Sequence, residues 1–276
     1  MTHSDSAPPL SWCHFPAGEH GFYRAPVLII GSTEAVLIDG GFAYSDARAV
    51  ADAIKATGKR LTLIYISQSD PDYYFNLGPI KAAFPNARVI AASATVAAIR
   101  GTVDKKLAIW GPQLKDNGPQ TLADVVIPET FDATTLSVDG ETIEIVDAEG
   151  LPNRRYVWVP SLQAVFGGVR LFSGVHVWTA DTNGAHQRAV WRANLDALAA
   201  RKPAVVVAGH MAPNAAADAS AITHTKEWLL AFEEELSKAL DSAALNAAMK
   251  ARFPGLGMEV AIDIGAKVAT GEMKWG

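Results

Sequence analysis

The chain has 276 residues, of which 49% are hydrophobic and 19% are charged, so it has enough apolar material for a substantial buried core. Its formal net charge of −5 provides no basic surface for neutralising phosphates, and we therefore expect no nucleic-acid partner. The single cysteine, Cys13, excludes an internal disulfide framework and a cysteine-rich zinc knuckle.

The N-terminal sequence MTHSDSAPPL has neither the basic nor the apolar region of a secretion signal. The sequence also lacks a run of about 18 apolar residues, which is the length needed to cross a bilayer. We therefore expect a soluble, cytoplasmic protein without a membrane partner.

The first half of the chain predicts strands that alternate with helices. Two β-branched segments, 26–30 and 35–39, flank a turn and predict a hairpin. Apolar positions at helical spacing follow between Ala47 and Ile54, and the apolar run 61–66 predicts a buried strand. The alternation continues with a helix at 76–84, a strand at 88–92, a helix from Ser93 towards Trp110 and a loop at 111–120.

The second half first predicts a meander of short strands separated by turn residues, at 125–127, 134–138, 142–146, 156–159 and 164–166. A helix follows around Trp191 and Leu198, and a buried strand at 204–208 leads into Gly209-His210. Two further apolar segments complete the chain, a long helix with Ile222, Leu229, Phe232, Leu236 and Leu240 on one face, and the stretch 258–269. Two β-rich layers with helices outside them predict an α/β (α+β) protein with a packed sandwich.

Four motifs in chain order resemble those of the metallo-β-lactamase superfamily. They are Leu-Ile-Asp-Gly-Gly at 37–41, the loop 67–78 after a buried strand, Val-Phe-Gly-Gly at 165–168, and the strand with terminal Gly-His at 205–210. The resemblance implies a four-layer αββα sandwich over residues 25–212. An N-terminal segment, 1–24, would precede it, and a C-terminal helical extension, 213–276, would pack on the same domain and cover the cleft or form a dimer contact.

The resemblance also shows which of the family's metal ligands are missing. In the aligned frame Gln68, Asp70 and Tyr73 stand where the loop has histidines, and Gly168 stands where a bridging aspartate is expected. The third histidine motif should fall within 149–153, which contains none. The family's dinuclear zinc site is therefore not expected, and the cofactor is either absent or one divalent ion.

Asp72 and His210 keep the residue types of the family frame. With Asp70, they are the expected catalytic residues and the expected ligands of a single ion, which oxygen ligands would bias towards manganese or magnesium. Alternatively, Asp70-Pro71-Asp72 is a turn in which Asp72 caps the next helix, and His210 is a structural histidine. Asp39 would orient a ligand or bind backbone amides.

Two groups of residues are candidates for contacts with a substrate. Gln68, Tyr73 and Tyr74 come from the loop after the buried strand, and His176, Trp178 and Asp181 come from the apolar segment 174–181. Their aromatic rings suit a small apolar molecule, although core packing and a strand with paired polar residues explain the same residues. Lys106 is expected on a solvated helix face.

Two functions from different classes follow. The first is a hydrolase-like protein that acts on a small ester, lactone or amide and retains at most one metal ion. The second is a catalytically silent or metal-free member of the family that binds a small molecule. In either case the expected partner is a small-molecule ligand or substrate. The sequence is also compatible with a homo-oligomer.

Overall fold

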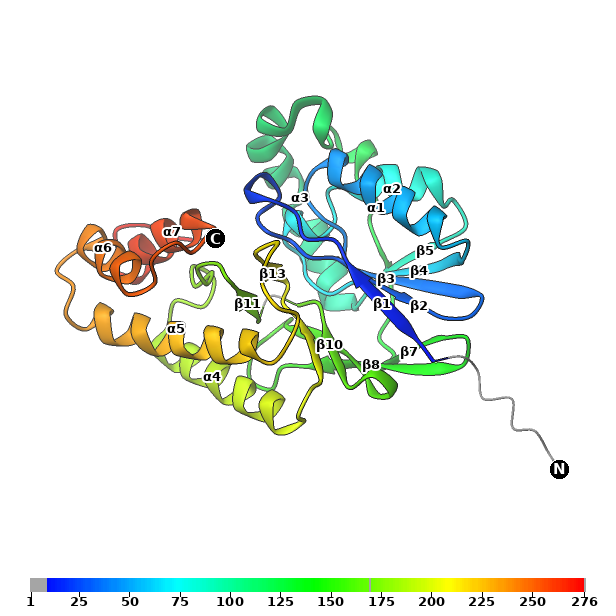
Figure 1. Cartoon of the computed structure of the whole chain (residues 1–276). Helices are drawn as coiled ribbons and strands as arrows, with labels where there is room; N and C mark the ends of the chain where they lie inside the picture. Colours follow the sequence, from blue (N-terminus) through cyan, green and yellow to red (C-terminus); the bar gives the residue numbers. More distant parts are fainter. Residues whose placement is uncertain (1–8, 169, 276) are drawn as a thin grey trace.

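Two β-sheets lie between outer helices, and the chain forms a four-layer αββα sandwich (Figure 1). The computed structural model describes residues 9–168 and 170–275. Helices of the first half cover one sheet, and helices of the second half lie against the other (Figure 1). No helix within these described ranges is long and apolar enough to cross a membrane.

The first sheet has six strands in chain order: β1 (Ser11–His14), β2 (Val27–Ile30), β3 (Glu34–Ile38), β4 (Arg60–Ile66), β5 (Arg88–Ala91) and β6 (Glu129–Thr130). From β3 onward the strands are parallel, and the connections include α1 (Tyr44–Ala56), α2 (Leu77–Ala83) and α3 (Ser93–Leu114). Residues 35–38 and 64–66 are fully buried, because a covered parallel strand contacts the core on both faces. The carboxyl ends of β3 and β4 therefore lie together at one edge of the sheet.

The second sheet is built mainly from the predicted meander, in the order β12 (Val205–Val207), β10 (Ala164–Phe166), β9 (Arg155–Val159), β8 (Glu141–Asp147) and β7 (Thr135–Val138). A separate parallel pair joins β11 (Phe172–Ser173) to β13 (His210–Met211). This pair follows β10 and β12 directly, so it brings His210 to the same end of the sandwich as the ends of β3 and β4.

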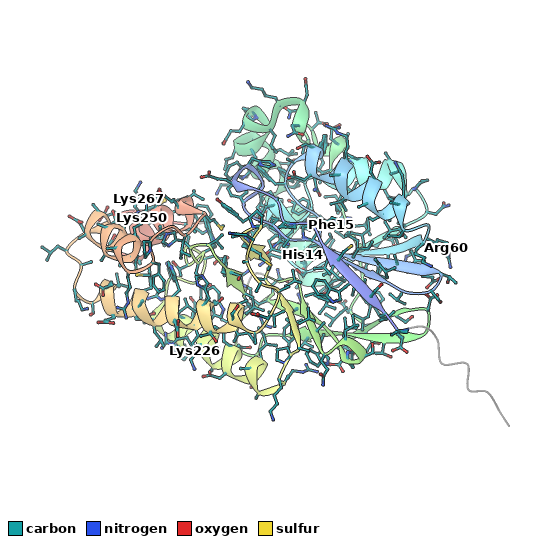
Figure 2. The ribbon with its side chains drawn as sticks, viewed as in Figure 1. His14, Phe15, Arg60, Lys226, Lys250 and Lys267 are labelled. Carbon is teal, nitrogen blue, oxygen red and sulfur yellow. The ribbon has the colours of Figure 1, made fainter. Side chains whose placement is uncertain are left out.

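Four helices follow in the second half: α4 (Ala185–Ala200), α5 (Ser220–Leu236), α6 (Ser242–Arg252) and α7 (Glu259–Ala269). Trp228 of α5 is fully buried and its indole donates a hydrogen bond to Nδ1 of His176 at 3.2 Å. Lysines join the helices at the surface, where Lys226 pairs with a carboxylate of α4 and Lys250 with one of α7 (Figure 2). These ion pairs thus connect α5 to α4 and α6 to α7.

The hairpin, the alternating first half and most of the meander are confirmed, but several local predictions are wrong. Residues 125–127 are not a strand; the short strand that pairs with β5 is Glu129–Thr130. Helix α3 continues through Pro112 to Leu114, and Leu240 lies beyond α5 with 98% of its surface exposed. The N-terminal segment also contributes β1, because its extended backbone completes the edge of the first sheet.

Candidate functional site

The polar loop after β4 meets the ends of three other strands. Asp39 follows β3, Ser67 follows β4, Gly168 lies just after β10, and His210 begins β13. Backbone hydrogen bonds hold these ends in register, since the Asp39 amide donates to the Tyr65 carbonyl at 2.8 Å. The predicted loop is therefore placed where carboxyl ends of parallel strands converge.

Asp39 holds this group of strand ends together. Its carboxylate accepts hydrogen bonds from the backbone amide and the hydroxyl of Ser67, at 2.7 and 2.8 Å. The Ser67 hydroxyl in turn accepts one from the Gly168 amide at 3.2 Å. Burial raises the pKa of Asp39, while Arg24 and these hydrogen bonds oppose the increase. Of the two roles that the sequence suggested for Asp39, the structure shows the second, a hydrogen bond from backbone N–H to its carboxylate.

A fully buried cation, Arg24, lies between the acidic side chains. Its Nη2 atom is 3.3 Å from a carboxylate oxygen of Asp39, and its Nε atom is 3.8 Å from Oδ2 of Asp72. Its Nη1 atom donates to the carbonyl of Gly209, and its Cζ atom lies 3.4 Å from the ring centre of Tyr73. Sequence reasoning missed Arg24. The available signal was a lone arginine immediately before the apolar run of β2.

The structure brings Asp72 and His210 together. Nε2 of His210 is 3.7 Å from Oδ2 of Asp72, and Nδ1 of His210 is 2.7 Å from the carbonyl oxygen of Phe22. The imidazole also stacks on Phe172, with ring centres 5.1 Å apart. The Asp72 side chain retains 12% exposure, whereas Arg24 has none. Asp72 is therefore the member of this group that reaches solvent.

Burial changes the protonation of both groups. It raises the pKa of Asp72 to about 7, with a further increase from Asp70 and an opposing effect of Arg24. It lowers the pKa of His210 to about 3, and Arg24 lowers it further. A neutral ring that donates Nδ1–H to Phe22 carries its lone pair on Nε2, facing Asp72. Asp72 is thus the group that exchanges a proton near neutral pH.

Asp70 faces a second set of charges. Its Oδ1 atom is 3.7 Å from Nζ of Lys106, which also donates to the Ser69 carbonyl at 2.6 Å. Burial raises the pKa of Asp70, as does the nearby charge of Asp181. The Lys106 side chain is only 18% exposed, so its prediction as a solvated helix residue is wrong. The reason is that α3 packs this lysine against the loop, which periodicity does not reveal.

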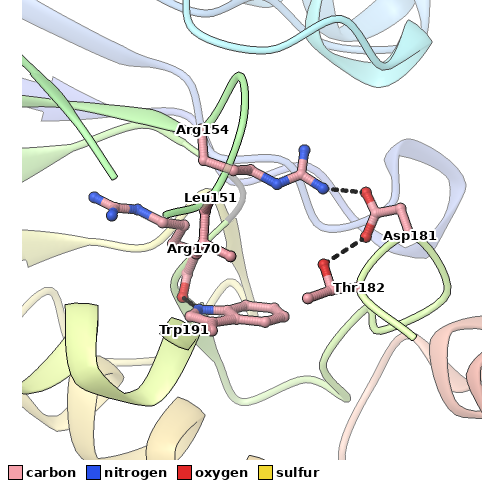
Figure 3. Close-up of a pocket in the computed structure, with 6 residues that line it drawn as sticks. All are labelled: Leu151, Arg154, Arg170, Asp181, Thr182 and Trp191. Atoms are coloured by element: carbon pink, nitrogen blue, oxygen red, sulfur yellow. Dashed lines mark hydrogen bonds and ion pairs between the residues drawn. The ribbon is translucent and has the colours of Figure 1, made fainter. Parts of the chain in front are cut away.

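Asp181 lies near this outer part of the site. Its carboxylate pairs with Arg154 and accepts a hydrogen bond from the Thr182 hydroxyl at 3.2 Å (Figure 3). Trp191 forms another wall of the small hollow in Figure 3, and its indole donates to the Arg170 carbonyl at 3.0 Å. Of the three candidates in segment 174–181, Asp181 is the one that interacts electrostatically with the loop after β4.

His176 and Trp178 have their contacts elsewhere. His176 accepts a hydrogen bond from the Trp228 indole of α5, and the ring centres of Trp178 and Trp275 are 5.0 Å apart. Segment 174–181 is not a regular strand; one bridge joins Val175 to Gly257. These contacts connect both residues to the C-terminal region, and their contact with a substrate stays a prediction.

The aromatic loop residues are more buried than a substrate-binding lining requires. Tyr73 and Tyr74 are fully enclosed, and Gln68 is 2% exposed. The Gln68 Oε1 atom accepts a hydrogen bond from the Ser69 amide at 2.6 Å. Its Nε2 atom and both tyrosine hydroxyls have no hydrogen-bond partner among the described residues. Core packing explains their rings, while these orphaned polar atoms leave hydrogen-bonding capacity beside Asp72.

The residues present do not fit the family's metal centre. Among the described residues, no group of three or more His, Cys, Asp or Glu side chains is arranged to hold a metal ion. The expected trio divides instead, because Asp72 contacts His210 and Arg24 while Asp70 contacts Lys106. Asp70, Asp72 and His210 thus do not form one group of ligands in this structure, and their binding of a single ion stays a prediction. A guanidinium occupies the space between the carboxylates.

A larger cavity of about 720 Å³ is lined by residues other than Asp72, Arg24 and His210. It lies between the N-terminal turn, the segment after β13 and the segment before α7, with Glu19, Tyr23, Ala212, Leu256, Met258 and Glu259 among its lining residues. Tyr23 precedes Arg24 in the chain, and Ala212 follows His210 by two residues. The C-terminal region thus forms one wall of this cavity.

Position 209 has no room for a side chain, because its backbone lies close to the backbone of Gly168. A Cβ atom at position 209 would lie 1.8 Å from the Gly168 carbonyl oxygen and 3.0 Å from Arg24 Nη1. We expect Gly209→Ala to lower the midpoint of urea unfolding, because backbone must move to accept the methyl group. Gly101→Ala is the matched control, since a Cβ there meets nothing within 4 Å in the helix α3. That change should raise stability by up to about 1 kcal/mol; equal midpoints for the two variants would contradict the expectation.

Comparison with known proteins agrees with this geometry. A family model for the metallo-beta-lactamase superfamily matches residues 22–210, which is more than half of the chain. A metallo-beta-lactamase family protein from Thermus thermophilus is structurally similar, with a TM-score of 0.63 and 18% identity, and the match covers 96% of this chain and 94% of that one.

A metallo-beta-lactamase from Pontibacter korlensis has a TM-score of 0.53 and 18% identity, with 82% of this chain and 97% of that one covered. At this identity the two structures support the fold alone. No curated protein gives a match. The family model covers the strand ends, the loop after β4 and His210, and on that ground the chain belongs to the metallo-β-lactamase superfamily.

Proposed function

We propose that the chain is a hydrolase of a small ester, lactone or amide in which Asp72 is the general base. The observation that carries the proposal is the position of Asp72. Its carboxylate contacts His210 and Arg24 at the convergence of the strand ends, and it keeps access to solvent. Active sites of sandwich and α/β folds commonly use side chains at such strand ends.

The proposed reaction needs one group that takes and returns a proton. Asp72 accepts a proton from a water molecule as that water attacks the carbonyl carbon, and it then donates the proton to the departing oxygen or nitrogen as the bond breaks. His210 and Arg24 are positioning residues, because both contact Oδ2 of Asp72 while remaining buried. Lys106, the partly exposed cation beside the loop, is placed to favour charge that develops on the carbonyl oxygen.

The cavity whose wall includes Tyr23, the chain neighbour of Arg24, supports a small-molecule substrate. Its volume of about 720 Å³ lies within the range of ligand pockets, and its wall includes Tyr23, Leu256 and Met258. These residues offer apolar contact, while Glu19 and Asn214 in the same wall offer polar contacts. A substrate with an apolar body and a polar carbonyl group fits this combination.

A catalytically silent binding module is the second candidate, and a specific observation favours it. Arg24 already contacts both Asp39 and Asp72, so the carboxylates of the centre share a positive charge supplied by the protein itself. A centre whose charge is compensated in this way binds a carbonyl compound without cleaving it. The two candidates differ in turnover and share the requirement for a ligand in the cavity.

The test is hydrolysis of a panel of nitrophenyl esters, lactones and anilides by the purified full chain, with and without chelator. We expect slow turnover that rises with pH through about 7, as Asp72 loses its proton. Asp72→Asn should reduce the rate by about 10² to 10⁴, the usual contribution of a general base. Asp52→Asn, at an exposed position on α1, is the matched control and should have the wild-type rate.

Each result separates the candidates. Turnover that Asp72→Asn leaves intact would refute the role of Asp72. If chelator abolishes turnover, catalysis depends on a bound metal ion, and the mechanism given above is refuted. Absence of turnover, with saturable binding of a panel compound in calorimetry, would favour the binding module. Absence of both would refute both candidates.

A further inference from the structure

We propose that the guanidinium of Arg24 is the resident cation of this site and fills the place that the family resemblance assigns to metal. Asp72 and His210 keep the residue types of family ligands. Asp72 lies beside this guanidinium, and His210 contacts the same carboxylate oxygen of Asp72. A cation of the chain itself therefore joins the ends of the strands that a metal ion would otherwise bridge. This inference concerns what occupies the centre and does not depend on hydrolysis.

The surroundings of Arg24 match a guanidinium in shape and charge. Its planar group has five N–H donors in a fixed geometry. The donors reach a carboxylate oxygen of Asp39 at 3.3 Å and the carbonyl of Gly209, while Nε, which makes no hydrogen bond among the described residues, lies 3.8 Å from Asp72. Two carboxylates and one carbonyl oxygen thus surround a single buried positive charge.

One replacement at the family's ligand positions contacts the same cation, and another leaves no room for a carboxylate. Tyr73 stands where a histidine is expected, and its ring face lies 3.4 Å from Cζ of Arg24, a cation–π arrangement. Gly168 stands where the bridging aspartate is expected, and it has φ of +81°. A Cβ at position 168 would lie 2.3 Å from the Arg155 carbonyl oxygen, so a carboxylate side chain does not fit there.

A buried arginine and a metal ion exclude each other at this position. Bringing a divalent cation beside Arg24 would place like charges a few ångströms apart where side chains exclude most of the water, so Coulomb repulsion would weaken the binding of the ion. The neutral orphan atoms nearby, on Gln68 and Tyr73, are poor ligands for zinc. Arg24 is accordingly expected to decide whether this loop takes metal.

The test measures zinc binding by equilibrium dialysis and elemental analysis, together with the melting temperature in EDTA and in zinc. The wild-type chain should retain no stoichiometric zinc, and its melting temperature should be the same in both solutions. Two engineered chains follow, both with Gln68→His and Asp70→His. One of them keeps Arg24, and the other also has Arg24→Gln.

We expect the chain with Arg24→Gln to bind one zinc equivalent that raises its melting temperature. Its partner with Arg24 retained should bind at least about tenfold more weakly, because of the repulsion. Equal affinities in the two engineered chains would overturn the proposal. Stoichiometric zinc in the wild-type chain would also overturn it, and that measurement needs no variant to fold. This experiment does not measure hydrolysis. The proposal about Arg24 and the proposed catalytic function can therefore fail independently of each other.

Discussion

Replacing Asp39 with asparagine is expected to lower the free energy of unfolding by about 3–5 kcal/mol, the usual cost of removing one partner from a buried ion pair. The carboxylate is 1% exposed, and it lies opposite Arg24, which has no exposure. In the variant the guanidinium remains buried with less compensation. The Ser67 hydroxyl also loses its charged acceptor, since one oxygen becomes an amide nitrogen.

Asparagine is the informative choice because Asp39 has φ of 62°, in the left-handed region that both residues tolerate. The substitution therefore isolates charge from backbone strain. Urea unfolding followed by fluorescence and circular dichroism provides the measurement. Asp52→Asn, an exposed change next to Lys55, should leave the midpoint unchanged. A loss below about 1 kcal/mol for Asp39→Asn would mean that the Arg24 and Ser67 contacts do not hold the strand ends together.

The second large effect is a pair of opposite pH dependences at the centre of the site. The pKa of Asp72 rises from its ordinary value of 3.8 to about 7 on folding, so between these values the folded chain binds the extra proton. Its contribution to stability is therefore lost as pH increases through this range. The pKa of His210 falls from 6.5 to about 3, so between these values the unfolded chain binds the extra proton. Its contribution is lost as pH decreases.

Between about pH 4 and 6.5 the two contributions have opposite signs and offset each other in the wild-type chain. In the Asp72→Asn variant only the His210 contribution remains, so the stability of that variant should rise with pH relative to wild type. In the His210→Gln variant only the Asp72 contribution remains, so the stability of that variant should fall with pH relative to wild type. Each relative slope is limited to about 1.4 kcal/mol per pH unit, the value for one proton.

Urea unfolding of the three chains at several pH values measures these slopes. The comparison with wild type removes the contributions of other titrating groups, such as Asp39 and Asp70, so far as the substitution leaves them unchanged. Parallel stability curves for all three chains would show that neither pKa changes on folding. The double variant, Asp72→Asn with His210→Gln, should again follow the wild-type slope, because both opposing contributions are then absent.

Local patterns determined the regular elements of this protein. The hairpin of β2 and β3, the parallel strand β4 and the strands β7 to β10 follow from alternating or continuous apolar runs and from the turn residues between them. These signals are short-range, because side-chain direction repeats every two residues in a strand and every 3.6 in a helix. The four ordered motifs likewise led to the correct fold and to the pairing of Asp72 with His210.

The errors came from residues whose role depends on distant parts of the chain. Arg24 lies 15 residues from Asp39 and 185 from Gly209, and no periodicity connects them. Lys106 looked like a surface residue, since its helix packs on the loop after β4 only in the folded chain. His176 carries the same residue type as a ligand, yet it contacts α5 through Trp228.

The sequence by itself determined the sandwich and the loop at which its polar residues converge, because hydrophobic periodicity and turn chemistry act over a few residues. The tertiary structure decided what that convergence contains. A buried guanidinium is stable only where several distant segments supply carboxylate, carbonyl and aromatic partners at once, here Asp39, Asp72, Gly209 and Tyr73. Such a set of contacts exists only after the two sheets have packed together.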